Sequence, residues 1–208
     1  MSQKEALERR EDAMPAIFDE EGRAAMRSTM LAAGFDIMRE RGVQHLTVSE
    51  VTRRSGIAKG TFYSFFPSKE EFVYQIVSRG RVRVAQELKQ AAEAGSGTVD
   101  RAGFERWLRT MWQEGGQLYR AITMEGWRYL SATWPRERAF NPELDKETCL
   151  WILGMARDAS PNANWKVLAN LQKTLAMLYL NAENLHADAL DETADHLLRA
   201  IVEEVFDS

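Results

Sequence analysis

The sequence predicts an all-α protein. It contains only five prolines in 208 residues, and no stretch alternates apolar and polar side chains with a period of two over the length of a strand. Apolar residues instead recur at helical spacing nearly throughout the chain. We therefore expect helices from about residue 22 to the C-terminus, with ends set by glycines, prolines and capping residues.

The first helix is expected to run from about Gly22 to Arg41. Gly42 follows it and can take the left-handed backbone conformation that ends many helices. The residues before this helix, 1–21, form a highly charged arm, which we expect to be disordered.

Residues 47–71 predict two very short helices separated by a glycine, followed by the start of a third. Thr47 and Glu50 have the spacing of a capping box, so a helix begins just after Thr47, and Gly56 ends it without a Cβ clash. The next helix, residues 59–65, is too short to be stable without tertiary contacts. Neighbouring phenylalanines can provide these contacts: Phe62, Phe65 and Phe66. Such a pair of helices forms a helix-turn-helix, whose second helix can lie in the major groove of DNA.

A longer helix is expected next. Pro67 ends the short helix, and Ser68 with Glu71 forms a second capping box that starts a helix over residues 69–94. The glycine-serine sequence of residues 95–98 breaks this helix and is the best candidate for a domain boundary.

The remaining sequence predicts further helices and one connection punctuated by prolines. The helices cover residues 100–113, 116–134, 144–157, 164–184 and 190–206, and the connection covers residues 135–142. The last two helices carry the most regular apolar stripes, at Leu168, Leu171, Leu175 and Leu178 and at Leu190, Leu197, Leu198, Ile201 and Val205. Each stripe can be buried within one subunit or against a second one.

The helix-turn-helix region carries a specific set of residues. They are Ala33, Gly34, Phe35, Gly42 and Thr47, followed by the run GIAKGTFYSFFPSKEEF from Gly56 to Phe72. Together they resemble the DNA-binding domain of the TetR family of transcriptional regulators, over roughly residues 24–75. The resemblance implies about nine helices. These would form a helix-turn-helix domain over residues 22–68, a connecting helix over 69–94, and a helical effector-binding and dimerisation domain over 95–208.

The resemblance also implies a double-stranded DNA operator and a small-molecule effector that shifts the recognition helices apart. Operator half-sites about one helical turn apart require two symmetric recognition helices, so a homodimer is expected. Its last two helices would pair with their copies, which assigns the residues of both apolar stripes to the dimer interface. The family's habit favours a repressor over an activator.

The expected DNA-binding residues lie in the helix-turn-helix and at the start of the following helix. They are Thr47, Arg53, Lys59, Gly60, Thr61, Tyr63, Ser64 and Lys69. Threonine and serine on the exposed side of the recognition helix can meet base edges or a thymine methyl group, and Gly60 permits close approach. Thr47 and Lys69 stand at helix starts, which favour phosphates. Arg53 and Arg54 could contact the DNA backbone or form a solvated helix face.

Two positions depart from the family pattern. Ala58 stands where the family most often has serine, so it cannot cap the recognition helix and forgoes about 1 kcal/mol of stabilisation. Phe65 stands where histidine or tyrosine often reaches a phosphate, and phenylalanine offers no hydrogen-bonding group. In the charged arm, Arg9 and Arg10 could enter a minor groove, although the acidic residues around them favour disorder.

The net charge of −4 is divided unevenly along the chain. Residues 22–90 contain 12 basic and 6 acidic residues, whereas residues 91–208 contain 12 basic and 18 acidic ones. The basic region is the one with the motif, which fits phosphate neutralisation. The sequence has no run of 18 apolar residues and no apolar signal-peptide core, so we expect a cytoplasmic protein without membrane contact.

Aromatic residues and methionines are concentrated between residues 104 and 151, which include five of the six tryptophans. Such side chains line ligand cavities, but they also form ordinary cores, and spacing alone favours a core. The resemblance raises the cavity interpretation and suggests effector-binding residues. They are Trp107, Met111, Trp112, Tyr119, Trp127 and Trp151. Gly115, Gly116 and Gly126 could loosen the helices around them.

No enzyme signature is present: the sequence has no P-loop, G-x-G-x-x-G, H-E-x-x-H or G-x-S-x-G motif, so neither catalytic residues nor a cofactor is expected. The single Cys149 is expected to be a small buried residue. An acidic run could bind a metal, although solvated helix ends explain it more simply. It comprises Glu183, His186, Asp188, Asp191, Glu192 and Asp195. The competing hypothesis is a helical ligand-sensing or protein-interaction dimer without sequence-specific DNA binding.

Overall fold

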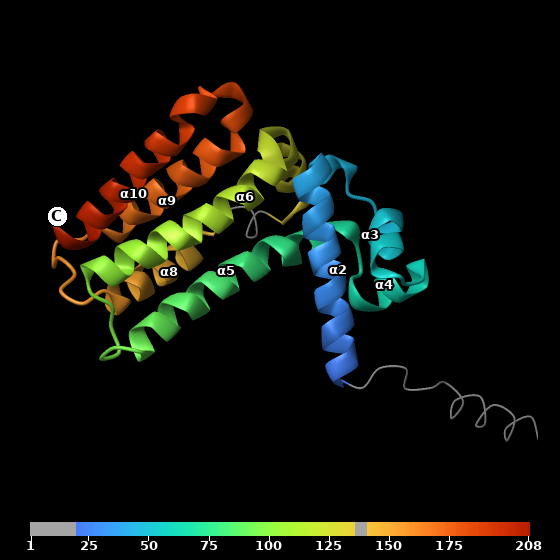
Figure 1. Ribbon diagram of the computed structural model, residues 1–208, viewed down its shortest axis with the longest axis horizontal. Helices are drawn as coiled ribbons and strands as arrows, with labels where there is room; N and C mark the ends of the chain where they lie inside the picture. The colour runs from blue at the N-terminus through green and yellow to red at the C-terminus, as the bar shows by residue number, and fades with distance from the viewer. Residues whose placement is uncertain (1–19, 136–140) are drawn as a thin grey trace, which may run out of the picture.

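The computed structural model describes residues 20–135 and 141–208, apart from the side chains of residues 80–84, 114, 115 and 117. Within these ranges the chain is helical, and the only extended pairing is an isolated bridge between Val99 and Ala156. The α-helices are α2 (Glu20–Arg41), α3 (Val48–Ser55), α4 (Lys59–Phe65), α5 (Lys69–Glu93), α6 (Arg101–Thr133), α8 (Pro142–Met155), α9 (Trp165–Leu180) and α10 (Leu190–Phe206) (Figure 1). Short 3-10 turns form η1 (Val43–His45), η2 (Ala182–Asn184) and η3 (Ala187–Ala189). The predicted all-α fold is confirmed.

The helix ends around the helix-turn-helix are set by the expected local interactions. The Thr47 hydroxyl accepts a hydrogen bond from the Glu50 N–H at 3.2 Å, and the Ser68 hydroxyl accepts one from the Glu71 N–H at 3.1 Å. Gly56 ends α3 with φ 67° and ψ 29°, the left-handed conformation that glycine adopts without strain. Ala58 provides no side-chain cap for α4.

Helix α2 begins at Glu20, two residues before the predicted start at Gly22. Acidic residues at Glu20 and Glu21 occupy the first turn, where they complement the positive end of the helix dipole. Arg9 and Arg10 lie outside the described residues.

The predicted break between residues 113 and 116 is wrong. Helix α6 continues through that region and becomes non-helical only at Thr123, with φ 60° and ψ 164°. Gly116 serves close packing instead, since a Cβ there would lie 3.0 Å from the Tyr179 ring of α9. At Thr123 the hydroxyl accepts a hydrogen bond from the Gly126 N–H at 3.3 Å, which is the spacing of an N-cap. The second part of α6 thus has its own start.

Buried side chains form two clusters that meet along α5 and α6. The N-terminal cluster combines α2, η1, α3, α4, the first half of α5 and the later part of α6, and the C-terminal cluster combines the rest of α5 and α6 with α8, α9 and α10. Tyr119 packs against both clusters. The loop over residues 95–98 lies at the opposite end of α5 from α4, so the two clusters do not divide at this loop. The division into domains therefore stays a prediction.

None of the helices in the described ranges has both the length and the apolar character needed to cross a membrane.

Gly126 lets the later part of α6 approach the N-terminal cluster. A Cβ at this position would lie 2.3 Å from Cγ1 of Val43 in η1, and Val43 is fully buried. Only a hydrogen atom fits there, so Gly126 is a packing residue and not a point of looseness in the helix.

Gly126→Ala should therefore lower the free energy of unfolding by about 1–3 kcal/mol, because the added methyl group overpacks the contact with Val43. The measurement is chemical denaturation followed by circular dichroism. Gly154→Ala is the matched control: Gly154 is an exposed helical glycine with no atom within 4 Å of its would-be Cβ. That variant should be unchanged or more stable by up to about 1 kcal/mol. Equal effects of the two substitutions would contradict the packing role.

Candidate nucleic-acid interface

Helix α4 presents a polar surface because its apolar side is anchored in the N-terminal cluster. Phe62 and Phe66 are fully buried, and their ring centroids lie 5.1 and 4.8 Å from that of Phe72 in α5. The opposite side of α4 carries the predicted base-contacting residues. Lys59, Gly60, Tyr63 and Ser64 are exposed, and Thr61 is half-buried.

Two of these side chains have defined local settings. The Ser64 hydroxyl donates a hydrogen bond to the Thr61 carbonyl oxygen at 2.7 Å, which leaves the hydroxyl oxygen able to accept one. Tyr63 is 49% exposed although it is aromatic, so it is one of the large side chains that the fold leaves in solvent. An exposed tyrosine beside threonine and serine suits recognition of a polar partner.

Phe65, which departs from the family pattern, lies beside the guanidinium of Arg23, whose central carbon is 4.9 Å from the ring centroid. Arg27 lies similarly over Phe66 at 5.2 Å. These contacts place two basic residues of α2 next to α4, where the sequence pattern gave no indication of them.

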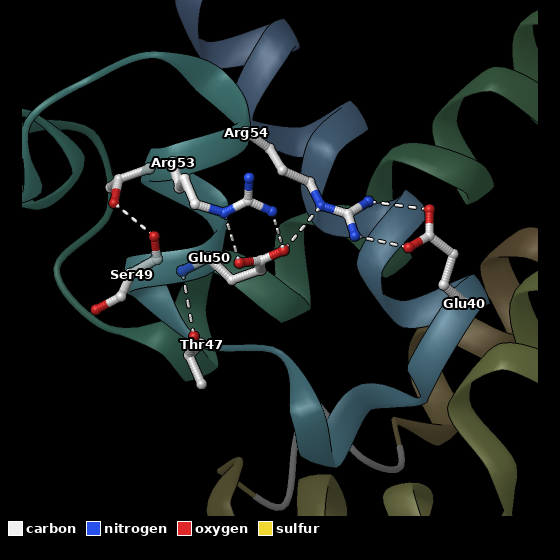
Figure 2. A network of polar contacts seen from close by, with 7 residues as sticks. Glu40, Thr47, Ser49, Glu50, Arg53 and Arg54 are labelled. Carbon is white, nitrogen blue, oxygen red and sulfur yellow. Dashed lines mark hydrogen bonds and ion pairs between the residues drawn. The ribbon is translucent and has the colours of Figure 1, made fainter.

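A network of charged side chains ties α3 to α2 (Figure 2). The Arg54 guanidinium donates to both carboxylate oxygens of Glu40 at 3.0 and 2.6 Å, and its Nε donates to Glu50 Oε1 at 3.2 Å. Arg53 donates to both oxygens of Glu50 at 2.9 and 2.6 Å. In a full capping box the Glu50 carboxylate would accept a hydrogen bond from the Thr47 amide. Here the carboxylate is turned toward the two arginines instead.

The arginines keep both carboxylates ionised. Hydrogen bonds from Arg53 and then Arg54 lower the pKa of Glu50 to about 2, and a hydrogen bond from Arg54 is the main cause of the lowered pKa of Glu40. A lowered pKa means that the network contributes to stability above the ordinary carboxyl pKa of 4.5 and that this contribution is lost as the pH falls toward 2. At neutral pH the network is fully charged.

The two arginines have different settings. Arg54 is 21% exposed and bridges two helices, so it is a structural residue and neither a solvated nor a free phosphate-binding one. The predicted phosphate contact, Arg53, is 68% exposed, and Glu50 is its one ion-pair partner among the described residues. Arg53 can meet a phosphate only by sharing or leaving this carboxylate.

The start of α5 is held by the end of α6. Lys69 lies with its Nζ 5.1 Å from the Tyr129 ring centroid, and the Tyr129 hydroxyl is 3.4 Å from the Glu70 carboxylate. Trp134 donates from its indole nitrogen to the Glu70 carbonyl oxygen at 3.2 Å. The predicted phosphate contact at Lys69 is therefore in direct contact with a helix that also enters the C-terminal cluster.

Residues 30–76, which contain the helix-turn-helix, match the family model described as "Bacterial regulatory proteins, tetR family". The helix-turn-helix region of this chain is thus that of a TetR-family regulatory protein.

Two kinds of relatives agree with the TetR assignment. The HTH-type transcriptional repressor NemR of Escherichia coli K12 is 30% identical over 92 residues, which is 43% of this chain and 46% of NemR. The chain thus matches about half the length of this relative.

A TetR-family transcriptional regulator from Rhodococcus sp. has 18% identity and a TM-score of 0.57, covering 86% of this chain and 97% of that one. A transcriptional regulator from Streptomyces coelicolor A3(2) has 17% identity and a TM-score of 0.55, covering 86% and 98%. These structures share the TetR fold.

The aromatic residues suggested for an effector site do not all come together. Trp107 and Trp112 are buried in the C-terminal cluster, and Met111 and Trp151 pack against it. Trp127 instead packs against the N-terminal cluster, 6.1 Å from the Trp134 ring. Their role in binding an effector stays a prediction.

Trp112 has the most informative environment of this set. Its ring stacks on Tyr119 at 5.7 Å and on Tyr179 at 6.2 Å, and burial is the main cause of the raised pKa of Tyr179. Its indole nitrogen is buried and has no hydrogen-bond partner among the described residues. A buried N–H without an acceptor is costly, so Trp112 is a residue of this set whose environment needs explanation.

Most residues assigned to the dimer interface are buried within the subunit itself. Leu168, Leu175, Leu190, Leu198, Ile201 and Val205 are at most 7% exposed and belong to the C-terminal cluster. These six pack within the subunit, where α9 contacts α6, α8 and α10, and α10 contacts α6 and α9. Their assignment to a dimer interface stays a prediction. Leu171, Leu178 and Leu197 remain half-buried. On α9 the exposed apolar residues are Val167 and Met177, at 39% and 45%.

The acidic run near the C-terminus is partly neutralised by α6. Arg120 binds Asp191 at 3.0 Å, and Arg109 binds Asp195 at 2.6 Å. Within the described ranges, no three histidine, cysteine, aspartate or glutamate side chains are grouped as a metal site would require. Cys149 is buried, and desolvation raises the pKa of its thiol to about 11.

Glu50→Gln should make binding of random-sequence duplex DNA more dependent on salt. The substitution releases Arg53 to phosphate, so the fall of log K with log salt should steepen by up to about 0.9. Fluorescence anisotropy over a salt series measures this slope. Glu40→Gln is the control, because it removes a carboxylate that contacts Arg54 but not Arg53. An unchanged slope in Glu50→Gln would show that Arg53 meets no phosphate.

Proposed function

We propose that this protein is a transcriptional regulator that binds a palindromic operator as a homodimer. We infer further that it is a repressor that a small-molecule effector releases from DNA. The observation that carries the proposal is the setting of α4. This short helix is anchored by Phe62, it is separated from α3 by the turn at Gly56, and its exposed side is polar.

The size of α4 suits the major groove. Seven residues make a helix about 10 Å long, and the groove is about 12 Å wide. Lys59 can meet a phosphate or a guanine, Thr61 and Ser64 can meet base edges or a thymine methyl group, and Gly60 lets the backbone approach. Tyr63, Thr47 and Lys69 complete the proposed contacts. The surplus of basic residues in residues 22–90 supports this orientation toward DNA.

The proposed dimer brings two copies of α4 to neighbouring half-sites. Palindromic half-sites require two subunits related by a two-fold axis. We place the contact between these subunits on the exposed side of α9 and on the neighbouring part of α10 around Leu197. Val167 and Met177 are exposed there, and Leu171, Leu178 and Leu197 are half-buried. The proposed surface keeps the three half-buried residues of the predicted interface and adds the two exposed ones, Val167 and Met177.

The proposed effector acts through α6. A ligand that accepts a hydrogen bond from Trp112 would bind beside Tyr119, which packs against both clusters. The later part of the same helix contacts the DNA-binding region at Val43 and at Glu70. If the ligand and the operator favour different arrangements of α6, the ligand lowers the affinity for the operator. The size of this effect is set by the difference in ligand affinity between the two arrangements. The repressor assignment is supported by the name of NemR alone.

The recognition helix can be tested by selection of random DNA fragments at fixed, near-physiological salt, followed by anisotropy titration. Wild-type protein should enrich one palindrome and bind it with two subunits per site. Replacing Lys59, Thr61 and Tyr63 together by alanine should weaken binding to that palindrome by at least about 100-fold, because each good base contact contributes about 1–3 kcal/mol. The dimer, checked by sedimentation, should be unaffected because all three side chains lie on α4.

Undiminished binding by the triple variant would contradict the assignment of α4. Weak, strongly salt-dependent binding of every fragment by the wild type would favour the alternative, a helical ligand-sensing or interaction dimer without sequence-specific DNA recognition.

The proposed interface can be tested with one charged substitution on each of two helices. Met177→Glu on α9 should raise the dimer dissociation constant by about 100-fold, because a carboxylate would be desolvated without a partner. Leu150→Glu on α8 is the matched control: Leu150 is 48% exposed, close to the 45% of Met177. Sedimentation equilibrium distinguishes them. Dissociation by Leu150→Glu alone would place the interface on α8.

A further inference from the structure

A hollow lies at the end of the C-terminal cluster that is opposite α3 and α4. The C-terminal end of α5, the loop over residues 95–100, the first turns of α6 and Arg157 surround a volume of about 670 Å³. Figure 1 shows this end of α5 and α6 on the other side of the molecule from the helix-turn-helix. The volume falls within the range of small-molecule sites.

Backbone hydrogen bonds fix the wall of this hollow. The Val99 N–H donates to the Met155 carbonyl oxygen at 2.8 Å, and the Arg157 N–H donates to the Val99 carbonyl oxygen at 2.7 Å. The loop between α5 and α6 is thereby paired to the segment that follows α8. A site built on paired backbone needs little ordering when a ligand binds.

Two arginines of the hollow lack carboxylate partners. Among the described residues, Arg106 makes no ion pair, and the Arg157 guanidinium has only long contacts with the hydroxyls of Thr98 at 3.5 Å and Ser96 at 3.4 Å. Both side chains are exposed. They are held near the loop and the helix start: Nη2 of Arg157 lies 3.9 Å from the would-be Cβ of Gly95, and Nη2 of Arg106 lies 3.8 Å from that of Gly103.

This lack of partners contrasts with the other arginines of the first two-thirds of α6. Arg101 binds Asp207 at 2.7 Å, Arg109 binds Asp195 at 2.6 Å, and Arg120 binds Asp191 at 3.0 Å. Acidic residues outnumber basic ones over residues 91–208. A shortage of carboxylates therefore does not explain the two unpaired guanidinium groups.

The remaining lining defines what else the site offers. Of its two carboxylates, Asp100 accepts a hydrogen bond from the Gly103 N–H at 2.8 Å as the cap of α6, and Glu87 also makes a polar contact. Ala91, Val99 and Trp107 add apolar surface. A ligand for this hollow thus combines an anionic group with an apolar body.

We propose that this hollow is a binding site for a small organic oxyanion, in which Arg106 and Arg157 hold the anionic group. Carboxylates and phosphates match the planar fork of a guanidinium, which can donate two parallel hydrogen bonds to either. The apolar body of the ligand lies beside Ala91 and Trp107. This site is distinct from the Trp112 environment and does not depend on the proposed DNA-binding function.

The test is calorimetric titration of the purified full chain, at constant ionic strength, with benzoate and separately with inorganic phosphate. Benzoate probes a carboxylate with an apolar ring, and phosphate probes the oxyanion alone. We expect saturable binding of at least one probe, weakened at least about tenfold in the double variant Arg106→Gln/Arg157→Gln, because charge-assisted hydrogen bonds are lost. Circular dichroism should show an unchanged fold, since both side chains are exposed.

Arg128→Gln is the matched control, because it removes the same charge from an exposed position in the later part of α6. It should bind both probes as the wild type does. The proposal is overturned if neither probe binds at concentrations up to about 10 mM, or if the double variant binds as well as the wild type. In the second case the anions occupy other basic residues, such as those of α4. Neither outcome bears on operator selection, which is measured separately.

Discussion

The burial of Phe62 is the interaction on which the polar surface of α4 depends. Helix α4 has seven residues and no side-chain cap, so its own hydrogen bonds cannot hold it in a helical state. Contacts of Phe62 and Phe66 with Phe72 supply the missing stabilisation and fix the rotation of α4 about its axis. That rotation decides which residues face outward. The polar surface of α4 is thus a consequence of an aromatic cluster on its other side.

The charged network around Glu50 sets the second constraint on the same surface. Phenylalanines hold α4 against α5, whereas Arg54 holds α3 against α2. Gly56 lies in the turn between the two helices and has no side chain that could hold them together. The helix-turn-helix is therefore held by apolar packing, which also includes Val48 and Val51 of α3, and by an ionic contact, and only the ionic contact responds to pH.

The sequence was sufficient for features that depend on a few neighbouring residues. The caps at Thr47 and Ser68 and the left-handed Gly56 follow from short-range geometry, so α3, α4 and the start of α5 were predicted within a residue or two. The break in α6 was misplaced because its glycines are used for close approach to Tyr179 and Val43, which lie far away in the sequence. An apolar stripe likewise shows that a helix face is buried, but not what covers it.

For the candidate site too, the sequence predicted the features that depend on neighbouring residues but not the contacts between distant ones. Of the five predicted residues of α4, all but the half-buried Thr61 are exposed, because a helix buried through Phe62 must expose Tyr63 and Ser64. The spacing of Glu50 to Arg53 and Arg54 is that of helical ion pairs and could have indicated their pairing. The partner on α2, Glu40, is 14 residues from Arg54 and could not be inferred from periodicity. The division of the tryptophans between the two clusters also depends on contacts between residues far apart in the sequence, so periodicity could not predict it.

The cap at Thr123 has a consequence for how the molecule can be divided. The part of α6 that follows it packs against the N-terminal cluster through Leu130 and Trp134, and Ile122 precedes it there. The N-terminal cluster is consequently discontinuous in sequence, since it takes in side chains from beyond residue 120. A chain ending at the loop over residues 95–98 would retain the whole helix-turn-helix and lose part of the core on which it rests.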